Sequence, residues 1–121
     1  MKKRTVALAA FLVMLAGISL VAAEEKFGVA VYDGAKYDEA TTQFLIQAMK
    51  VEAYCCRTND TVAKVIAFYK KQPGLELIDE NDKGGMFKKG DVDVTIQNPW
   101  MDMKTGKTNT DTLISIVKQK G

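Results

Sequence analysis

Apolar and polar residues alternate along several stretches of the chain, and this alternation predicts β-strands. In residues 92–97, apolar residues alternate with polar ones, and in 51–56 Val, Ala and Cys alternate with Glu, Tyr and Cys. Successive side chains of a strand point to opposite faces of a sheet, so each stretch would have two faces of different composition. Residues 26–32 and 113–117 are short apolar stretches that we also interpret as strands. Pro99 ends the strand over 92–97, because proline has no amide hydrogen to donate within a sheet.

Two further stretches have helical spacing. In residues 61–72 apolar side chains recur at three- and four-residue intervals, which predicts an amphipathic helix. The polar residues 58–60 precede it as a capping cluster, and Pro73-Gly74 ends it. A second helix is expected over 39–49, with Asp38 as its N-cap.

The segment after the helix over 61–72 predicts a β-hairpin: a strand over 75–78, a polar turn over 79–85 and a return strand that starts at 86–87. The turn imitates the start of a calcium-binding loop. Lys83 and Gly90 stand where such a loop needs oxygen ligands, so we interpret the segment as a hairpin turn and predict no metal there.

Two helices and several mostly antiparallel strands predict an α+β fold. We expect a two-layer sandwich in which a sheet of about four to six strands is covered by one or two helices. The helix over 61–72 should lie at the centre of the core, because a sheet without such a cover is unstable in water.

The first 23 residues have the three parts of a secretory signal peptide. A basic start at Lys2-Lys3-Arg4 is followed by an apolar stretch, which ends in small residues at Ala22-Ala23. Cleavage after Ala23 would leave 98 of the 121 residues, a length suited to one domain over 24–121. The alternative is an uncleaved membrane anchor, in which case the uncleaved signal would be the chain's only membrane contact. We expect a periplasmic or secreted protein.

The positive charge of the chain belongs to this leader. The sequence has 17 Lys and Arg against 15 Asp and Glu, and without the three leader cations the count is 14 against 15, a net charge of −1. A basic patch for nucleic acid is therefore not expected.

The residue types exclude several kinds of catalysis. The chain has no histidine, which removes the Ser-His-Asp and Cys-His arrangements, histidine-ligated haem and the usual catalytic zinc sites. Ser115 is the only serine after the leader, and it falls inside an expected strand. We therefore expect no cofactor and favour a non-enzymatic function.

Cys55 and Cys56 are adjacent, so they cannot cross-link distant parts of the chain. On a strand they would point to opposite faces, one into the core and the other exposed or beside a neighbouring strand. A redox pair, a soft-metal ligand pair and a homodimer linked by a cysteine are the alternatives that the sequence leaves open.

Trp100, Met101, Asp102 and Met103 form a largely apolar stretch where a polar connecting loop is expected. Adaptable methionines beside a rigid aromatic side chain are typical of recognition surfaces, so these four residues are the candidate ligand- or partner-binding site. The alternative is that this loop folds back and caps the open end of the core.

The middle of the chain resembles a loose group of small exported bacterial proteins of unknown function, which share a Tyr-Pro-Gly-Ala-Lys turn and a Thr-x-Asp-capped Lys-Val-x-x-Phe-Tyr-Lys-Lys helix. In place of that Pro this chain has Asp33, and after the cap Thr61 replaces a Ser. The resemblance covers about 40 residues; it implies the fold and the compartment and assigns no catalytic residue. The matching residues are Tyr32, Gly34, Ala35, Lys36, Thr58, Asp60, Lys64, Val65, Phe68, Tyr69, Lys70 and Lys71.

The sequence leads to three functional hypotheses. The first is an exported domain that binds a protein partner or a small ligand. The second is a thiol-dependent redox or metal-handling protein built on Cys55 and Cys56. The third is a structural subunit of a cell-envelope assembly that uses Trp100 and the strand edges as contacts.

Overall fold

The computed structural model describes residues 24–120. The expected signal peptide over 1–23 and residue 121 lie outside the described residues.

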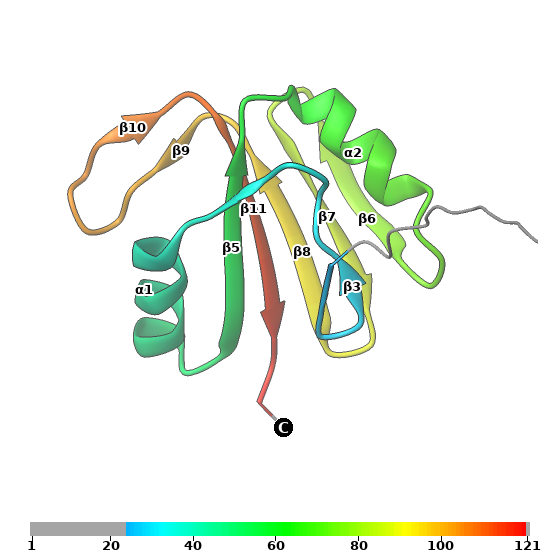
Figure 1. The fold of residues 1–121 in the computed structure, drawn as a ribbon, viewed down its shortest axis with the longest axis horizontal. Helices are drawn as coiled ribbons and strands as arrows, with labels where there is room; N and C mark the ends of the chain where they lie inside the picture. Colours follow the sequence, from blue (N-terminus) through cyan, green and yellow to red (C-terminus); the bar gives the residue numbers. More distant parts are fainter. Residues whose placement is uncertain (1–23, 121) are drawn as a thin grey trace, which may run out of the picture.

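A six-stranded antiparallel sheet forms the centre of the molecule, with the strand order β4-β5-β11-β8-β7-β6 (Figure 1). The last strand of the chain, β11, lies between β5 and β8, while β6, β7 and β8 form a simple meander. Together with two helices, this sheet confirms the predicted α+β sandwich. The strands are β4 (Lys36–Tyr37), β5 (Glu52–Thr58), β6 (Glu76–Asn81), β7 (Gly84–Lys89), β8 (Val92–Gln97) and β11 (Thr112–Lys118).

The helices α1 (Glu39–Met49) and α2 (Val62–Lys70) pack on opposite faces of the sheet. We call the face under α2 the covered face and the other the open face. Along the sheet, α1 lies at the β5 end and α2 towards the β6 end (Figure 1). The covered face carries Cys56, Ile96 and Ile114, and the open face carries Cys55, Thr95 and Ser115.

The main hydrophobic core lies between α2 and the covered face. Val62, Val65, Ile66 and Tyr69 of α2 are buried there, which confirms the central position expected for this helix. Burial of each such apolar side chain contributes about 1.5–3 kcal/mol. The Tyr69 hydroxyl donates a hydrogen bond to the carbonyl oxygen of Ala30 at 2.8 Å, which joins α2 to the N-terminal segment.

The predicted strand over 26–32 was wrong. The chain instead forms two short paired strands, β2 (Glu25–Lys26) and β3 (Val29–Ala30), around a turn at Phe27-Gly28. Both turn residues have positive φ, 56° and 81°, and glycine adopts this conformation without steric cost. Gly28 is a sequence signal for this turn, but the apolar residues around it favoured one continuous strand.

The first helix, predicted over 39–49 with Asp38 as its cap, is confirmed to the residue. The Asp38 carboxylate accepts a hydrogen bond from the Thr41 amide at 3.1 Å. The buried Thr42 hydroxyl accepts from the Cys55 amide at 2.9 Å and donates to the Asp38 carbonyl oxygen at 2.8 Å. Thr42 therefore fastens α1 to β5.

The cap of α2 differs from the prediction. Thr61, and not the cluster over 58–60, is the N-cap, and its hydroxyl accepts from the Lys64 amide at 3.2 Å. Asp60 instead accepts a hydrogen bond from the Tyr32 hydroxyl at 2.6 Å. Burial and this contact with Asp60 raise the pKa of Tyr32 to about 12.

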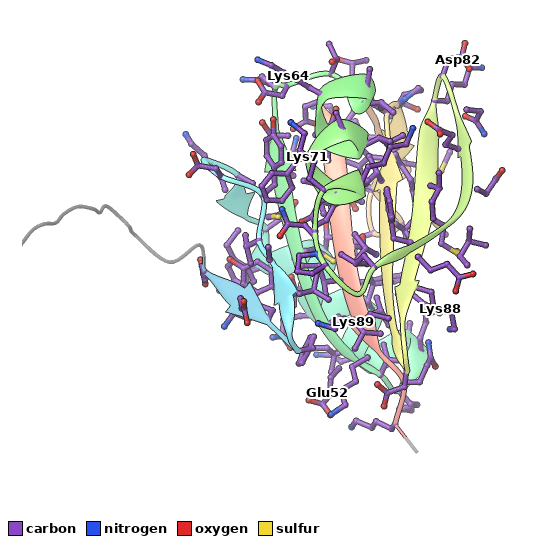
Figure 2. All side chains as sticks on the ribbon, turned by 90° about the vertical axis from the view of Figure 1, so that its right-hand side faces the viewer. Glu52, Lys64, Lys71, Asp82, Lys88 and Lys89 are labelled. Carbon is purple, nitrogen blue, oxygen red and sulfur yellow. The ribbon has the colours of Figure 1, made fainter. Side chains whose placement is uncertain are left out.

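Two of the predicted loops are partly β-structure. The hairpin turn predicted over 79–85 comprises only Asp82-Lys83, because residues 79–81 belong to β6 and residues 84–85 to β7. Polar residues are tolerated in β6 because it is an outer strand with exposed side chains. Asp82 lies at the tip of this turn, at the opposite end of the sheet from Lys88 and Lys89 (Figure 2). The connection after Pro99 forms a small ribbon from β9 (Trp100–Met101) and β10 (Thr108–Asn109), which extends from the sheet on the side of α1 (Figure 1).

A candidate ligand groove on the open face

A groove of about 470 Å³ lies on the open face of the sheet. The floor is formed by β7, β8 and β11, and the walls by α1 and by residues 100–104 of the β9–β10 ribbon. The groove exists because α1 covers only the β5 end of this face, whereas the ribbon leaves the sheet after β8 (Figure 1).

The floor of the groove mixes polar and apolar side chains: β8 contributes Asp93, Thr95 and Gln97, and β11 contributes Ser115 between the apolar Leu113 and Val117. The register places Ser115 of β11 beside Thr95 of β8, and Thr95 beside Met86 of β7. Gln97 follows Thr95 on the same face, two residues along β8. These hydroxyl and amide groups can donate and accept hydrogen bonds.

The walls of the groove are mainly apolar. The helix α1 contributes Phe44, Leu45 and Met49, and the ribbon contributes Trp100, Met101 and Met103. The three wall methionines are more than half exposed: 58% for Met49, 55% for Met101 and 67% for Met103. The groove therefore presents apolar surface to solvent.

The four site residues predicted from the sequence, Trp100, Met101, Asp102 and Met103, all line this groove. Trp100 is 4% exposed and packs against Cys55, Leu113 and Leu45, so its ring also caps the small core under α1. The two sequence interpretations of this stretch thus apply to different residues. Trp100 closes the core, and Met101 and Met103 face outward.

Asp102 holds the shape of the ribbon. Its carboxylate accepts hydrogen bonds from the amides of Lys104 at 2.8 Å and Thr105 at 3.3 Å, and its own amide donates to the Lys107 carbonyl oxygen at 2.8 Å. Asp102 therefore positions the two flanking methionines.

Arg57 and Asp111 anchor the ribbon to the sheet. The Asp111 carboxylate accepts from Arg57 Nε at 2.7 Å and from Trp100 Nε1 at 2.9 Å. The Arg57 guanidinium lies 4.9 Å from the centre of the Trp100 ring and 3.5 Å from the Asp38 carboxylate. Burial alone would raise the pKa of Asp111, but the hydrogen bonds from Arg57 and Trp100 and the charge of Arg57 outweigh it, so this pKa is lowered.

The charged groups that line the groove are already engaged or hydrated. Asp93 accepts a hydrogen bond from Lys88 Nζ at 2.9 Å, and the Asp102 carboxylate is bound by loop amides. Lys104 is exposed. The groove therefore offers no buried, unmatched charge among the described residues.

Cys55 and Cys56 lie on opposite faces, as expected, but both are completely buried. Of the two surroundings expected for the second thiol, the structure shows the one beside a neighbouring strand: Cys55 Sγ lies 3.6 Å from the Ser115 hydroxyl of β11, and α1 and Trp100 cover it. Burial raises the pKa of both thiols, and that of Cys56 to about 12. Thiolates are the reactive and metal-binding form, so this environment disfavours redox chemistry, metal binding and an intermolecular disulfide.

Within residues 24–120, no three or more His, Cys, Asp or Glu side chains are grouped in a way that could hold a metal ion. In the same residues, no helix has the length and apolar character needed to cross a bilayer.

Sequence reasoning missed the groove residues outside the ribbon, above all Phe44, Met86, Thr95 and Ser115. The alternation over 92–97 placed Thr95 on the polar side of a strand, but only the strand register brings it beside Ser115. No protein-family model, curated protein or solved structure was found to match this chain, so the assignment of a function rests on the groove itself.

Proposed function

We propose that this protein is an exported, non-enzymatic binding protein that takes an apolar small molecule into the groove on the open face. The observation that carries the proposal is a groove of about 470 Å³ with exposed apolar walls and neutral hydrogen-bonding groups on its floor. Small-molecule sites are typically clefts of roughly 300–1,000 Å³ with mainly apolar walls and a few polar groups that fix orientation.

The surrounding structure supports a binding role. The ribbon is held in place by the contacts among Arg57, Asp111 and Trp100 and by the hydrogen bonds of Asp102. The wall that the ribbon forms therefore does not have to be ordered when a ligand binds. The two groove carboxylates, Asp93 and Asp102, are bound by Lys88 and by loop amides, which does not favour a role in proton transfer.

The proposal is tested with the uncharged fluorescent probe phenylnaphthylamine. The probe should bind the wild-type protein saturably with an increase in fluorescence. Met101→Lys should weaken binding by at least about tenfold, because an apolar ligand would have to desolvate the new ammonium group.

Ile78→Lys is the matched control, because Ile78 is 49% exposed on β6 and lies outside the groove, whereas Met101 is 55% exposed within it. This control should bind the probe like the wild type, and circular dichroism should show that both variants are folded. Absence of saturable binding to the wild type, or equal weakening in both variants, would contradict the proposal.

A further inference from the structure

The methionines of the described residues are all found in one place. Met49, Met86, Met101 and Met103 come from α1, β7, β9 and the loop after β9, and all four line the groove. Each is between 38% and 67% exposed, and none belongs to either hydrophobic core. The cores are filled instead by Val, Ile, Leu, Phe, Tyr, Trp and Cys side chains.

The position of these four methionines around the groove indicates that their sulfur atoms contribute to ligand binding. Leucine has a similar volume and would supply equally apolar walls, so a groove that needed only apolar surface has no need of four thioethers. The thioether differs in being polarizable and in making favourable contacts with the edges and faces of aromatic rings. Each such contact corresponds to roughly two- to tenfold in affinity.

The floor sets a second condition on the ligand. Thr95 and Gln97 present a hydroxyl and an amide group, Ser115 is 6% exposed and its hydroxyl accepts from the Cys55 thiol at 3.6 Å, and the Asp93 carboxylate is held by Lys88 at 2.9 Å. A charged ligand would lose hydration without gaining a matched partner on this floor. A hydroxyl or another neutral polar group would find both donors and acceptors.

We infer that the ligand of the groove is an uncharged aromatic small molecule whose ring contacts the methionine thioethers and whose neutral polar substituent hydrogen-bonds to the floor. This inference rests on the proposed function and adds the chemical class of the ligand. Met101 and Met103 are the specificity residues, because Asp102 between them fixes the ribbon that carries both.

The test compares two alcohols of matched skeleton, naphthalenemethanol and its fully saturated decalin analogue, by isothermal titration calorimetry. The saturated alcohol is the more hydrophobic, so a purely apolar groove would prefer it. The wild-type protein should instead bind the aromatic alcohol more tightly, by at least about threefold.

The double substitution Met101→Leu and Met103→Leu keeps the apolar volume and removes two sulfur atoms. It should weaken binding of the aromatic alcohol by about fourfold or more and leave the saturated alcohol within about twofold. Leu77→Met on β6, which adds a thioether outside the groove, should change neither affinity. Naphthoate, which carries a charge, should bind more weakly than naphthalenemethanol.

Equal affinity of the wild type for both alcohols, or an unchanged preference in the leucine variant, would overturn the inference. The binding function would still stand in that case, because phenylnaphthylamine and the saturated alcohol would continue to bind in the groove. If neither alcohol nor the probe bound, the proposed function itself would be refuted.

Discussion

Arg57 and Asp111 lie outside the groove, beside Trp100, and join three parts of the fold. Arg57 lies on β5 and contacts Asp111 before β11, the Trp100 ring of β9 and the Asp38 carboxylate that caps α1. The Arg57 side chain is 37% exposed, so solvent screens much of the charge interaction. The directed hydrogen bonds to Asp111 should therefore matter more than the ion pair as such.

Asp111→Asn should lower the free energy of unfolding by about 1–2 kcal/mol at neutral pH, because a charge-assisted acceptor for two donors is lost. The pKa of Asp111 is lower in the folded protein than in the unfolded chain, where an aspartate titrates near about 3.9. The ionised Asp111 carboxylate therefore stabilises the fold at pH values above the unfolded pKa of about 3.9. This stabilisation is lost as the pH falls through the pKa of the folded protein.

Urea unfolding of the wild type and Asp111→Asn between about pH 7 and about pH 3 measures this effect. The stability difference between them should shrink towards acid pH. Asp79→Asn on the exposed strand β6 is the control and should change stability little at any pH. A difference for Asp111→Asn that stayed constant over this range would contradict the assignment.

At the level of elements, the start of β7 depends on two glycines. A Cβ at Gly84 would overlap the carbonyl oxygen of Ile96, and a Cβ at Gly85 would lie 3.1 Å from Ile66 Cδ1 of α2. The glycine pair therefore allows β7 to approach β8 closely and α2 to lie directly on the covered face.

Gly84→Ala should destabilise the protein by about 1–3 kcal/mol or more, because the backbone of β8 must shift to admit the methyl group. Gly106→Ala is the comparison: its Cβ would meet nothing within 4 Å, so only the positive φ of 74° is strained. That variant should lose about 1 kcal/mol. Thermal or urea unfolding that ranked Gly84→Ala as no less stable than Gly106→Ala would show that β7 and β8 do not pack as described.

For the whole molecule, the two helices have unequal roles. Four residues of α2 are buried in the main core, whereas Thr42 is the one residue of α1 that is fully buried. Since burial of apolar area is the main source of stability, α1 should be the less stable element. One wall of the groove, α1, is thus attached mainly through Thr42 and its cap Asp38, whereas the ribbon is anchored by the hydrogen bonds that Asp111 accepts from Arg57 and Trp100.

Native-state hydrogen exchange tests this difference within one sample. The amides over 43–49 of α1 should exchange at least about tenfold faster than those over 65–70 of α2, and the central strands β5, β8 and β11 should be the most protected. Equal protection of the two helices would mean that α1 opens only when the whole domain unfolds.

Much of the fold could be predicted from local patterns. The bounds of α1 and its Asp38 cap, the alternation of β8 and the last strand follow from side-chain periodicity and capping, which act over a few neighbouring residues. The turn at Phe27-Gly28 and the extent of β6 were not predicted. The first hides among apolar residues, and the second is polar because its strand lies at the edge of the sheet.

By itself, the sequence determined the α+β class, the opposite orientation of Cys55 and Cys56, and the apolar character of residues 100–103. Only the tertiary structure decided that both thiols are buried and that the ribbon, α1 and the open face of β7, β8 and β11 line one groove. Local periodicity says which side of an element is apolar. Which elements meet depends on strand order and register, and these are fixed by contacts between residues far apart in the chain.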